Sequence, residues 1–399
     1  MKILTLFCGN FGIEYNLFDF TDKQLTNLIT GIITDIGSRT ADNRYECKGM
    51  SKHDIREVSN VIAALKWIND TLVKEGFITT PDDIDAVVHR VIHGLTKYRK
   101  ELVKVTPEVI DDVLEFADFA PEHNPYNAEG MKAALIVYPH AEQFAFFDTA
   151  PFVELPAKAY MYGLPYQFYT QYHIRRYGFH GISHLCAISE ACKLIGKSMQ
   201  RMKIISLYVG RGVSMAAFDK GKAIDTSMGF SPLEGLIMKM RSGNVDPQIL
   251  LYLASREGLS LIEIGSILNK SSGLLGLIGT TDIGHAYEEA TRGNEQARVG
   301  LDTFVYQIQK YFGAYYVALK GVDLLVFIAR DEDVVPQLWI DIVKGLEFMG
   351  AAIDETKAHA TVREEPTILS TDKSRFAIVY VPRHEERCMA KRVAELLQR

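Results

Sequence analysis

The sequence has little that would tie it to a membrane or to a nucleic acid. None of its apolar runs reaches the roughly eighteen residues of a membrane-spanning helix. The apolar run after Met1 is broken by Gly9 and Asn10 and closed by Glu14, so it is too short and too polar for a signal peptide. The formal net charge is −6 and no basic block stands out, so we expect neither nucleic acid nor an anionic membrane as a partner.

Cysteine is scarce and scattered. The five cysteines form no C-x-x-C pair, and their odd number suits reduced thiols better than a disulfide framework. We therefore expect a cytoplasmic protein. With 47% apolar and 24% charged residues the composition is that of a globular chain, and 399 residues favour two domains over one core.

Strand-like runs rich in Val, Ile, Phe and Tyr alternate with segments of helical periodicity. We predict strands at Lys2–Leu6, Ala86–Ile92, Gln143–Phe147, Lys203–Val209, Leu324–Ile328 and Phe376–Val381. We predict helices at Asp54–Glu75, Pro107–Phe119, Ala128–Val137, Ser183–Leu194, Pro247–Glu257, Gln296–Leu319 and Glu385–Leu397. This alternation indicates an α/β protein in which helices pack on mixed sheets.

The opening of the chain has an echo in its second half. Around Cys8–Gly12, and again around Gly210–Gly212, a strand leads into a glycine-bearing tip and a second strand. Glycines at such tips let the backbone approach a ligand closely, often a phosphate. Two halves that begin alike suggest a duplicated pair of domains with a cleft between the tips, divided after Asp148.

Polar residues at predicted strand and loop ends suggest a site for an oxyanion. Asp148 ends the apolar strand of "AFFDTAPF", where open α/β sheets bind ligands, although a capping or turn aspartate is an equally good interpretation. Arg90 and His93 lie at a similar strand end in "VVHRVIHG", and Arg241 lies in a glycine-bearing loop. Two guanidinium groups match the oxygens of a carboxylate or phosphoryl group bidentately.

Two histidines stand four residues apart in "GFHGISH", at His180 and His184. This is the spacing of a zinc-binding pair on a helix, but the glutamate of an H-E-x-x-H motif is absent. We therefore favour a loop histidine at the start of a helix, with His184 packed beneath it.

These motifs resemble the acetate kinase family, a branch of the sugar kinase, actin and Hsp70 superfamily. The similarity covers nearly the whole chain, in the family's order, through "MKIL…CG…YNLFD", "HRVIHG", "APEHNPYN", "FDTA", "LPYQFYTQYHIRRYGFHGISH", "DTSMGFSPLEGL", "RSGNVDP", "SSGLLG" and "VPRHEE". It implies a duplicated α/β fold of the ribonuclease H-like, actin-like ATPase type, with two mixed sheets flanked by helices. The implied N-terminal domain consists of residues 1–148 and 384–399. The implied C-terminal domain consists of residues 149–383, and it would carry the nucleotide side of the site and the contact surface of a homodimer.

The resemblance also implies phosphoryl transfer between a nucleotide and a small carboxylate such as acetate. The residues at the family's catalytic positions are Asp148, Arg90, His180, Arg241 and His123. Asp148 would orient the acyl group, the two arginines and His180 would hold the oxygens in transit, and His123 would lie nearby. A loose, anionic transition state needs this kind of positioning and fixed positive charge.

The resemblance implies an acyl pocket and a magnesium ligand as well. Phe179, Pro232, Ile92 and Glu122 correspond to the substrate-binding positions, and Glu385 corresponds to the residue that helps hold magnesium. Two of these differ from the family, which has a valine at Ile92 and a leucine at Glu122. A carboxylate against an acetyl methyl group is costly unless it is paired or rotated away.

The first glycine-bearing loop departs from the family. An asparagine is usual where Phe7 stands, serines at positions 10–12, and a lysine at Glu14. Phe7 cannot coordinate magnesium or bridge to it through water, so weak or absent magnesium binding is expected. The structural alternative for Phe7 is that it packs into the core of its own domain.

The nucleotide side departs further. The residues expected in its loops are Gly9, Asn10, Gly210, Arg211, Gly212 and Asp282. Tyr208 and Arg211 replace a histidine and an asparagine, the segment 280–284 has lost its usual arginine, and the acidic segment 330–334 replaces a glycine-rich loop. Acidic side chains repel phosphates if they face them, so these changes argue against ordinary ATP binding.

Three functions stay open on the sequence alone. The first is an ATP-dependent carboxylate kinase with altered loops. The second is a relative that uses pyrophosphate or phosphate, with Arg211 contacting the shorter anion. The third is a catalytically inactive relative that is kept for binding or assembly.

Overall fold

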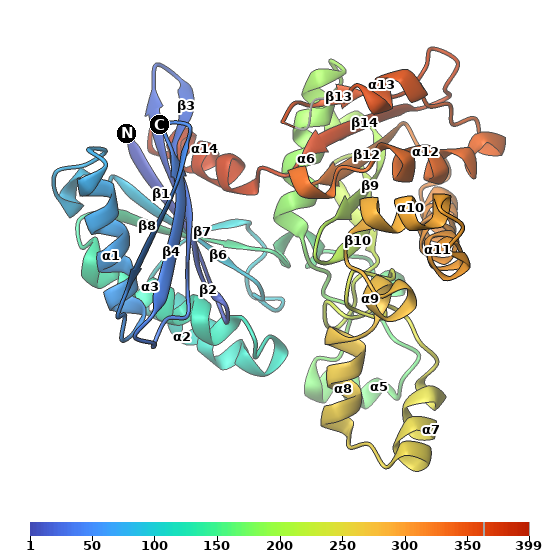
Figure 1. The fold of residues 1–399 in the computed structure, drawn as a ribbon, viewed down its shortest axis with the longest axis horizontal. Coiled ribbons are helices and arrows are strands. Elements are labelled where there is room, and N and C mark those ends of the chain that lie inside the picture. The colour runs from blue at the N-terminus through green and yellow to red at the C-terminus, as the bar shows by residue number, and fades with distance from the viewer. Residues whose placement is uncertain (362–363, 399) are drawn as a thin grey trace. The chain divides into compact units, whose positions relative to one another are not determined.

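The computed structural model describes residues 1–361 and 364–398, and the chain divides into two compact units. Met1–Val153 and His384–Arg399 form the first unit, and Glu154–Arg383 form the second. Figure 1 shows a sheet flanked by helices in each unit. The segment after Arg383 therefore returns to the unit in which the chain begins.

The first unit contains an eight-stranded sheet in the order β5-β4-β3-β2-β1-β6-β8-β7. Its strands are β1 (Lys2–Gly9), β2 (Gly12–Thr21), β3 (Gln24–Thr34), β4 (Ala41–Cys47), β5 (Met50–Arg56), β6 (Ala86–Val91), β7 (Leu102–Lys104) and β8 (Glu142–Phe147). Strands β1 to β5 pair antiparallel, β1, β6 and β8 run parallel, and β7 pairs antiparallel with β8. The carboxyl ends of β1, β6 and β8 therefore lie at one edge of the sheet.

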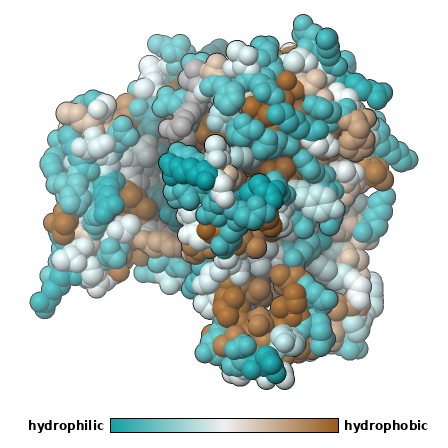
Figure 2. Space-filling view, turned by 45° about the vertical axis from the view of Figure 1, so that its right-hand side comes forward, coloured by the Kyte–Doolittle hydropathy of each residue, from teal (hydrophilic) through white to brown (hydrophobic). Residues whose placement is uncertain are grey.

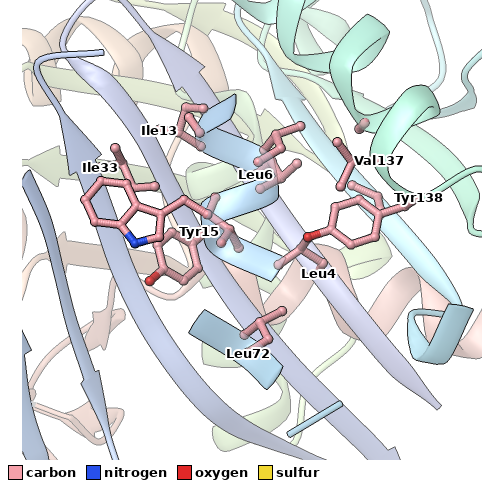
Figure 3. Packing of buried hydrophobic residues seen from close by; sticks show 14 of the residues in the cluster. Leu4, Leu6, Ile13, Tyr15, Ile33, Leu72, Val137 and Tyr138 are labelled. Carbon is pink, nitrogen blue, oxygen red and sulfur yellow. The ribbon is translucent and has the colours of Figure 1, made fainter. Parts of the chain in front are cut away.

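Helices cover this sheet. They are α1 (Val61–Lys74), α2 (Pro107–Glu115), α3 (Asn124–Val137) and α14 (Glu385–Leu397), with 3₁₀ turns at Pro81–Asp83, Phe116–Phe119 and Ala150–Phe152. The alternate residues Leu4 and Leu6 of β1 face a core that includes Leu72 of α1 and Val137 of α3 (Figure 3). Helix α14 also packs on β1, β2 and β6.

The second unit repeats the topology of the first. Its six-stranded sheet has the order β11-β10-β9-β12-β14-β13. The strands are β9 (Lys203–Val209), β10 (Val213–Asp219), β11 (Lys222–Thr226), β12 (Leu324–Ala329), β13 (Thr367–Ile368) and β14 (Ala377–Pro382). Order and strand directions match β3-β2-β1-β6-β8-β7, so the predicted duplication is confirmed and the first unit adds β4 and β5.

The second unit also contains helices, only some of which pack on this sheet. They are α4 (Ala157–Tyr160), α5 (Tyr166–Tyr172), α6 (Gly181–Leu194), α7 (Pro247–Glu257), α8 (Leu261–Lys270), α9 (Gly273–Ile278), α10 (Ile283–Thr291), α11 (Glu295–Leu319), α12 (Pro336–Lys344) and α13 (Glu355–His359). Further 3₁₀ turns lie at Met199–Arg201, Asp331–Asp333 and Glu347–Met349. Helix α6 packs on β9, β12 and β14, whereas α11 packs on β9, β10 and β11.

One predicted helix is wrong at its start. We expected a helix over Asp54–Glu75, but Met50–Arg56 forms the edge strand β5 and the helix begins only at Val61. The side chain of Asn60 accepts a hydrogen bond from the backbone N–H of Ala63 and so caps the helix. The cap and the alternating exposure of β5 outweigh the helical periodicity of the preceding residues.

In residues 1–361 and 364–398, no single helix has both the length and the apolar character needed to cross a membrane. Helix α8 and the segment Gly273–Thr291 meet both criteria only as a pair, and the pair is bent by 88°.

Candidate functional site

The first unit holds a buried ion-pair cluster formed by Arg90, Asp148 and Glu385. Nε and Nη2 of Arg90 donate to Oδ2 of Asp148 at 3.2 and 2.7 Å, and Nη1 donates to Oε1 of Glu385 at 2.8 Å. The three side chains are 9%, 1% and 0% exposed, respectively. The structure thus brings together three of the residues that the sequence singled out.

The topology of the sheet explains why these three side chains lie close together. Arg90 lies near the end of β6 and Asp148 directly follows β8, which runs parallel beside it. The backbone N–H of Asp148 donates to the carbonyl of Val91 at 2.9 Å and continues the ladder past the strand end. Glu385 opens helix α14, where the N-terminal dipole favours a carboxylate.

Phe7 is half-buried in β1 and contacts the same cluster. The guanidinium carbon of Arg90 lies 5.2 Å from the centroid of the Phe7 ring, which is a cation–π distance. Its hydrocarbon ring offers no metal ligand, but it supports one face of the arginine. Phe7 therefore packs within its own unit, where it contacts Arg90 and is half-buried.

Two asparagines at the start of α3 position the loops of this unit. Oδ1 of Asn127 accepts from the N–H of Ile92 at 3.1 Å, and its Nδ2 donates to the carbonyl of Cys8 at 2.7 Å. Asn124 binds the N–H and the carbonyl of His93 at 3.1 and 3.0 Å. The sequence interpretation missed both residues, although they stand in the "HNPYN" segment; their buried amides tie the β1 and β6 loops to one helix.

The remaining predicted residues of the first unit lie around these loops. His123 stands half-buried at the N-terminus of α3, Ile92 is buried after β6, and Glu122 is exposed. Burial lowers the pKa of the neighbouring His93 to about 3, so its imidazole is neutral at physiological pH. Since Nδ1 of His93 accepts from the N–H of Leu95 at 3.0 Å, this ring shapes the loop.

The tip of the first hairpin is a tight turn at Asn10 and Phe11. Gly12 has a φ of 136°, and a Cβ there would lie 1.9 Å from the carbonyl oxygen of Ile33, so a side chain is excluded. The tip lines a cavity of about 640 Å³ beside the start of α1. Two carboxylates, Asp35 and Glu129, also line this cavity, and each would repel a phosphate bound beside it.

In the second unit His180 occupies a strained position at the N-terminus of α6. Its backbone is left-handed, with φ of 58°, and Nδ1 of its ring lies 2.9 Å from Oγ of Ser214. A Cβ at Gly212 would lie 2.9 Å from Cε1 of His180, so only glycine leaves room for this ring. The expectation of a loop histidine at a helix start, with His184 buried beneath it, is confirmed.

The second glycine-bearing hairpin surrounds the same histidine. The ring of Tyr208 lies 4.4 Å from that of His180 at an angle of 47°, and its hydroxyl lies over Gly210, where a Cβ would be 2.7 Å away. Arg211 is exposed at the tip between Gly210 and Gly212. Tyr208 thus packs on His180.

A network of polar side chains braces the loop that carries Pro232. Nη2 of Arg176 donates to Oε1 of Glu234 at 2.7 Å, and its Nη1 donates to the carbonyls of three residues in the segment 226–228. Tyr162 donates to Oε2 of Glu234 and accepts from the N–H of Phe230. The sequence interpretation missed these residues, which fix the backbone around the acyl-pocket candidate Pro232.

Phe179 and Arg241 are placed by the same loops. Phe179 is 2% exposed and precedes His180, and the N–H of Gly178 donates to the carbonyl of Gly229. Nη1 of Arg241 lies 3.4 Å from the carbonyl oxygen of Pro232, and the guanidinium is half-buried. The structure therefore brings Arg241 and Pro232 together.

The acidic segment after β12 is partly neutralised. The carboxylate of Asp333 is 3% exposed and forms an ion pair with Lys239, which lies in the Arg241 loop. Burial raises the pKa of Asp333, and the bond to Lys239 opposes that rise. Asp333 therefore does not present a bare charge to a phosphate, whereas Glu332 is exposed and the side chain of Asp331 lies outside the described residues.

Asp282 has a structural task in the shortened segment before α10. Its side chain accepts a hydrogen bond from the N–H of His285 at 3.0 Å and caps the helix. Any contact of Asp282 with a nucleotide stays a prediction.

The described residues contain no group of three or more His, Cys, Asp or Glu side chains placed to hold a metal ion. His180 and His184 instead each bind Ser214, so the zinc alternative has no support in the geometry. The two carboxylates beside Arg90 are both occupied by its guanidinium, and any metal bound there stays a prediction.

The chain is similar to known proteins over its whole length. Residues 2–391 match the model of the acetokinase family. Acetate kinases from Carboxydothermus hydrogenoformans and Thermotoga maritima are 39% and 40% identical over 403 and 404 residues, each match covering 100% of this chain and 99% of the relative.

Solved structures agree with this match. The acetate kinase of Porphyromonas gingivalis aligns with a TM-score of 0.94 at 34% identity, over 99% of both chains. The propionate kinase of Francisella tularensis aligns with a TM-score of 0.89 at 29% identity, over 98% of both. The predicted fold, two mixed sheets flanked by helices in the actin-like ATPase arrangement, is confirmed.

Proposed function

Since this chain belongs to the acetokinase family, we propose that it transfers a phosphoryl group between ATP and a small carboxylate such as acetate. The observation that carries the proposal is the Arg90 cluster, in which the guanidinium is held on two sides by carboxylates and on a third by the Phe7 ring. A group fixed in this way needs no reorganisation when negative charge develops beside it.

The charges in this cluster favour a divalent cation. One guanidinium and two carboxylates sum to a negative charge, which repels a phosphate unless a cation joins the cluster. Magnesium takes one or two carboxylates and completes its shell with water and phosphate oxygens, so Asp148 and Glu385 fit it. When bound there, it would neutralise charge on the phosphates.

We assign roles in the reaction to the residues that stand at the family's catalytic positions. Asp148 orients the acceptor carboxylate, and Arg90 donates to oxygens of the transferred group while it holds Asp148. His180 and Arg241 of the second unit supply further donors to these oxygens, with His123 as a nearby donor in the first unit. We propose that Phe179, Pro232, Ile92 and Glu122, which correspond to the family's substrate-binding positions, contact the acceptor.

The phosphoryl donor is the finer point of this proposal. ATP is the donor we propose, with contacts from the loops at Gly9–Asn10 and Gly210–Gly212. Pyrophosphate is the second candidate, because exposed Arg211 offers a guanidinium at a hairpin tip where a shorter anion needs charge. An activity assay, and not the geometry of the loops, distinguishes ATP from pyrophosphate as the phosphoryl donor.

The assay uses the full chain with acetate and magnesium, and with ATP, pyrophosphate or phosphate as the donor in separate arms. Acetyl phosphate is trapped with hydroxylamine. We expect turnover with ATP that falls at least about 100-fold in Arg241→Ala, since one fixed donor to a developing anion is worth this much. Arg201→Ala, which removes an exposed arginine, is the control. Turnover with pyrophosphate alone would replace the donor, and background rates in every arm would favour the inactive relative.

We also propose a homodimer through the second unit and a cytoplasmic location. Figure 2 shows apolar side chains gathered over the α7 and α8 lobe. Leu251, Tyr252, Leu261 and Ile262 are 61%, 62%, 75% and 86% exposed. Exposed apolar patches of this kind mark association surfaces. Light scattering of Ile262→Glu against the unchanged chain tests this, with a monomer expected only for the variant.

A further inference from the structure

A chain of four side chains leads from His180 into the core of the second unit. Nδ1 of His180 lies 2.9 Å from Oγ of Ser214, which lies 2.9 Å from Nε2 of His184. Nδ1 of His184 lies 2.8 Å from Oγ of Ser206, and that hydroxyl donates to the carbonyl of Ala216 at 3.4 Å. Ser206, Ser214 and His184 are each 0% exposed.

The secondary structure explains why these groups line up. His180 and His184 stand one turn apart at the start of α6, which packs on β9. Ser206 of β9 pairs with Ala216 of β10, and Ser214 lies two residues before Ala216 on the same face of that strand. Two strand serines therefore face two histidines on one helix.

The contact of the Ser206 hydroxyl with the Ala216 carbonyl gives the direction that we assign to the protons along this chain. We assign the Ser206 proton to the Ala216 carbonyl, so that the Ser206 oxygen accepts from His184 and His184 carries its proton on Nδ1. Nε2 of His184 then accepts the Ser214 proton, and the lone pairs of Ser214 accept from Nδ1–H of His180. In this arrangement Nε2 is the nitrogen of neutral His180 that can take up a further proton.

We propose that Ser214 and His184 are positioning residues that hold His180 in its Nδ1–H tautomer, so that Nε2 is the nitrogen presented to the transferred phosphoryl group. The catalytic part of this inference rests on the function proposed above; the tautomer itself does not. A proton taken up at Nε2 makes His180 a cationic donor to a phosphoryl oxygen, while its Nδ1–H stays bound to Ser214. His184 acts only through Ser214, and Ser206 acts only through His184.

The matched variants come from the same part of the fold. Ser214→Ala removes the link to His180, and Ser214→Thr keeps the hydroxyl. Ser183→Ala is the control, because Ser183 is 3% exposed on the same helix and its hydroxyl has no hydrogen-bond partner among the described residues. Ser206→Ala removes the far end of the chain and leaves Ser214 in place.

Nitrogen-15 NMR of the imidazole groups reads the tautomer without any turnover, with His180→Gln used to assign the signal. We expect His180 in the Nδ1–H form in the unchanged chain, in Ser183→Ala and in Ser214→Thr. A mixture of both tautomers is expected in Ser214→Ala. An Nε2–H form in the unchanged chain, or no change in Ser214→Ala, would overturn the proposal even if the enzyme is inactive.

The kinetic arm tests the role in the reaction. Ser214→Ala should lower kcat at least about tenfold with little change in the KM for the carboxylate, because the cationic ring of His180 then lacks the Ser214 oxygen that accepts from its Nδ1–H. Ser206→Ala should lower kcat less, and Ser214→Thr should restore it. A loss as large in Ser183→Ala as in Ser214→Ala would show a packing effect and contradict the positioning role. Background turnover in the unchanged chain would instead reject the proposed function and leave the NMR result standing.

Discussion

Replacing Arg90 by glutamine should destabilise the first unit more than any loss of a surface charge. The change leaves the carboxylates of Asp148 and Glu385, which are 1% and 0% exposed, without the guanidinium that binds both. Removing one partner of a buried ion pair typically costs about 3–5 kcal/mol. For a domain of this size that corresponds to a fall in Tm on the order of 10 °C at neutral pH.

The sign of the pH dependence distinguishes this cause from a packing defect. Two buried carboxylates that lack their cation take up protons more readily than in the unfolded chain, so Arg90→Gln should regain stability as the pH falls from 7 toward 5. Added magnesium should stabilise the variant more than the unchanged chain, because a divalent cation can replace the lost charge.

Thermal unfolding followed by circular dichroism at pH 7 and pH 5 measures both effects. Arg201→Gln, an exposed arginine, is the matched control and should shift Tm by little at either pH. If Arg90→Gln unfolds at the same temperature as the unchanged chain at pH 7, the two carboxylates do not depend on Arg90. If its Tm falls equally at both pH values, the loss is steric and the electrostatic reasoning is refuted.

Three further predictions follow from single residues. Burial lowers the pKa of His89 to about 4 in the folded chain, whereas it is about 6.5 in the unfolded chain. The unfolded chain therefore takes up a proton at His89 at a higher pH, and stability is lost as the pH falls from about 6.5 to 4. In urea unfolding, the free energy of unfolding of His89→Gln should fall by about 2 kcal/mol less than that of the unchanged chain when the pH is lowered from 7 to 5. Asn127→Ala should cost about 2–4 kcal/mol in the same assay, because two buried backbone groups lose their partner, whereas Asn69→Ala should cost less. Phe7→Asn should lower the magnesium concentration for half-maximal activity several-fold by adding an oxygen ligand, and an equal effect in Phe7→Leu would contradict this.

Much of the fold could be predicted because its central strands are buried on both faces. Strands β6, β9 and β12 read as near-continuous apolar runs, which leave little choice of secondary structure. The half-exposed edge strand β5 has no such run, and the periodicity of its charged residues favours a helix. The local sequence pattern does not predict β5, because this strand is defined mainly by its pairing with β4.

The candidate site was predictable at strand ends and not across long sequence separations. Arg90 and Asp148 could be found because Arg90 lies near the end of an apolar strand and Asp148 directly follows another, and parallel neighbours end at one edge. The ion pair of Lys239 with Asp333 joins residues 94 positions apart, and no local signal marks it. Asn124 and Asn127 could have been noted as amide side chains beside Pro125, at the start of a helix. Their amides form hydrogen bonds with backbone groups of neighbouring loops.

The position of Glu385 also bears on how the chain is made. It lies 295 positions after Arg90, and all of the second unit is synthesised between the two. While the ribosome is still building that unit, the nascent first unit holds Asp148 and Arg90 but not the second carboxylate or helix α14. Its sheet therefore leaves the exit tunnel without α14, the helix that packs on β1, β2 and β6. The packing of the first unit is complete only when α14 has been synthesised.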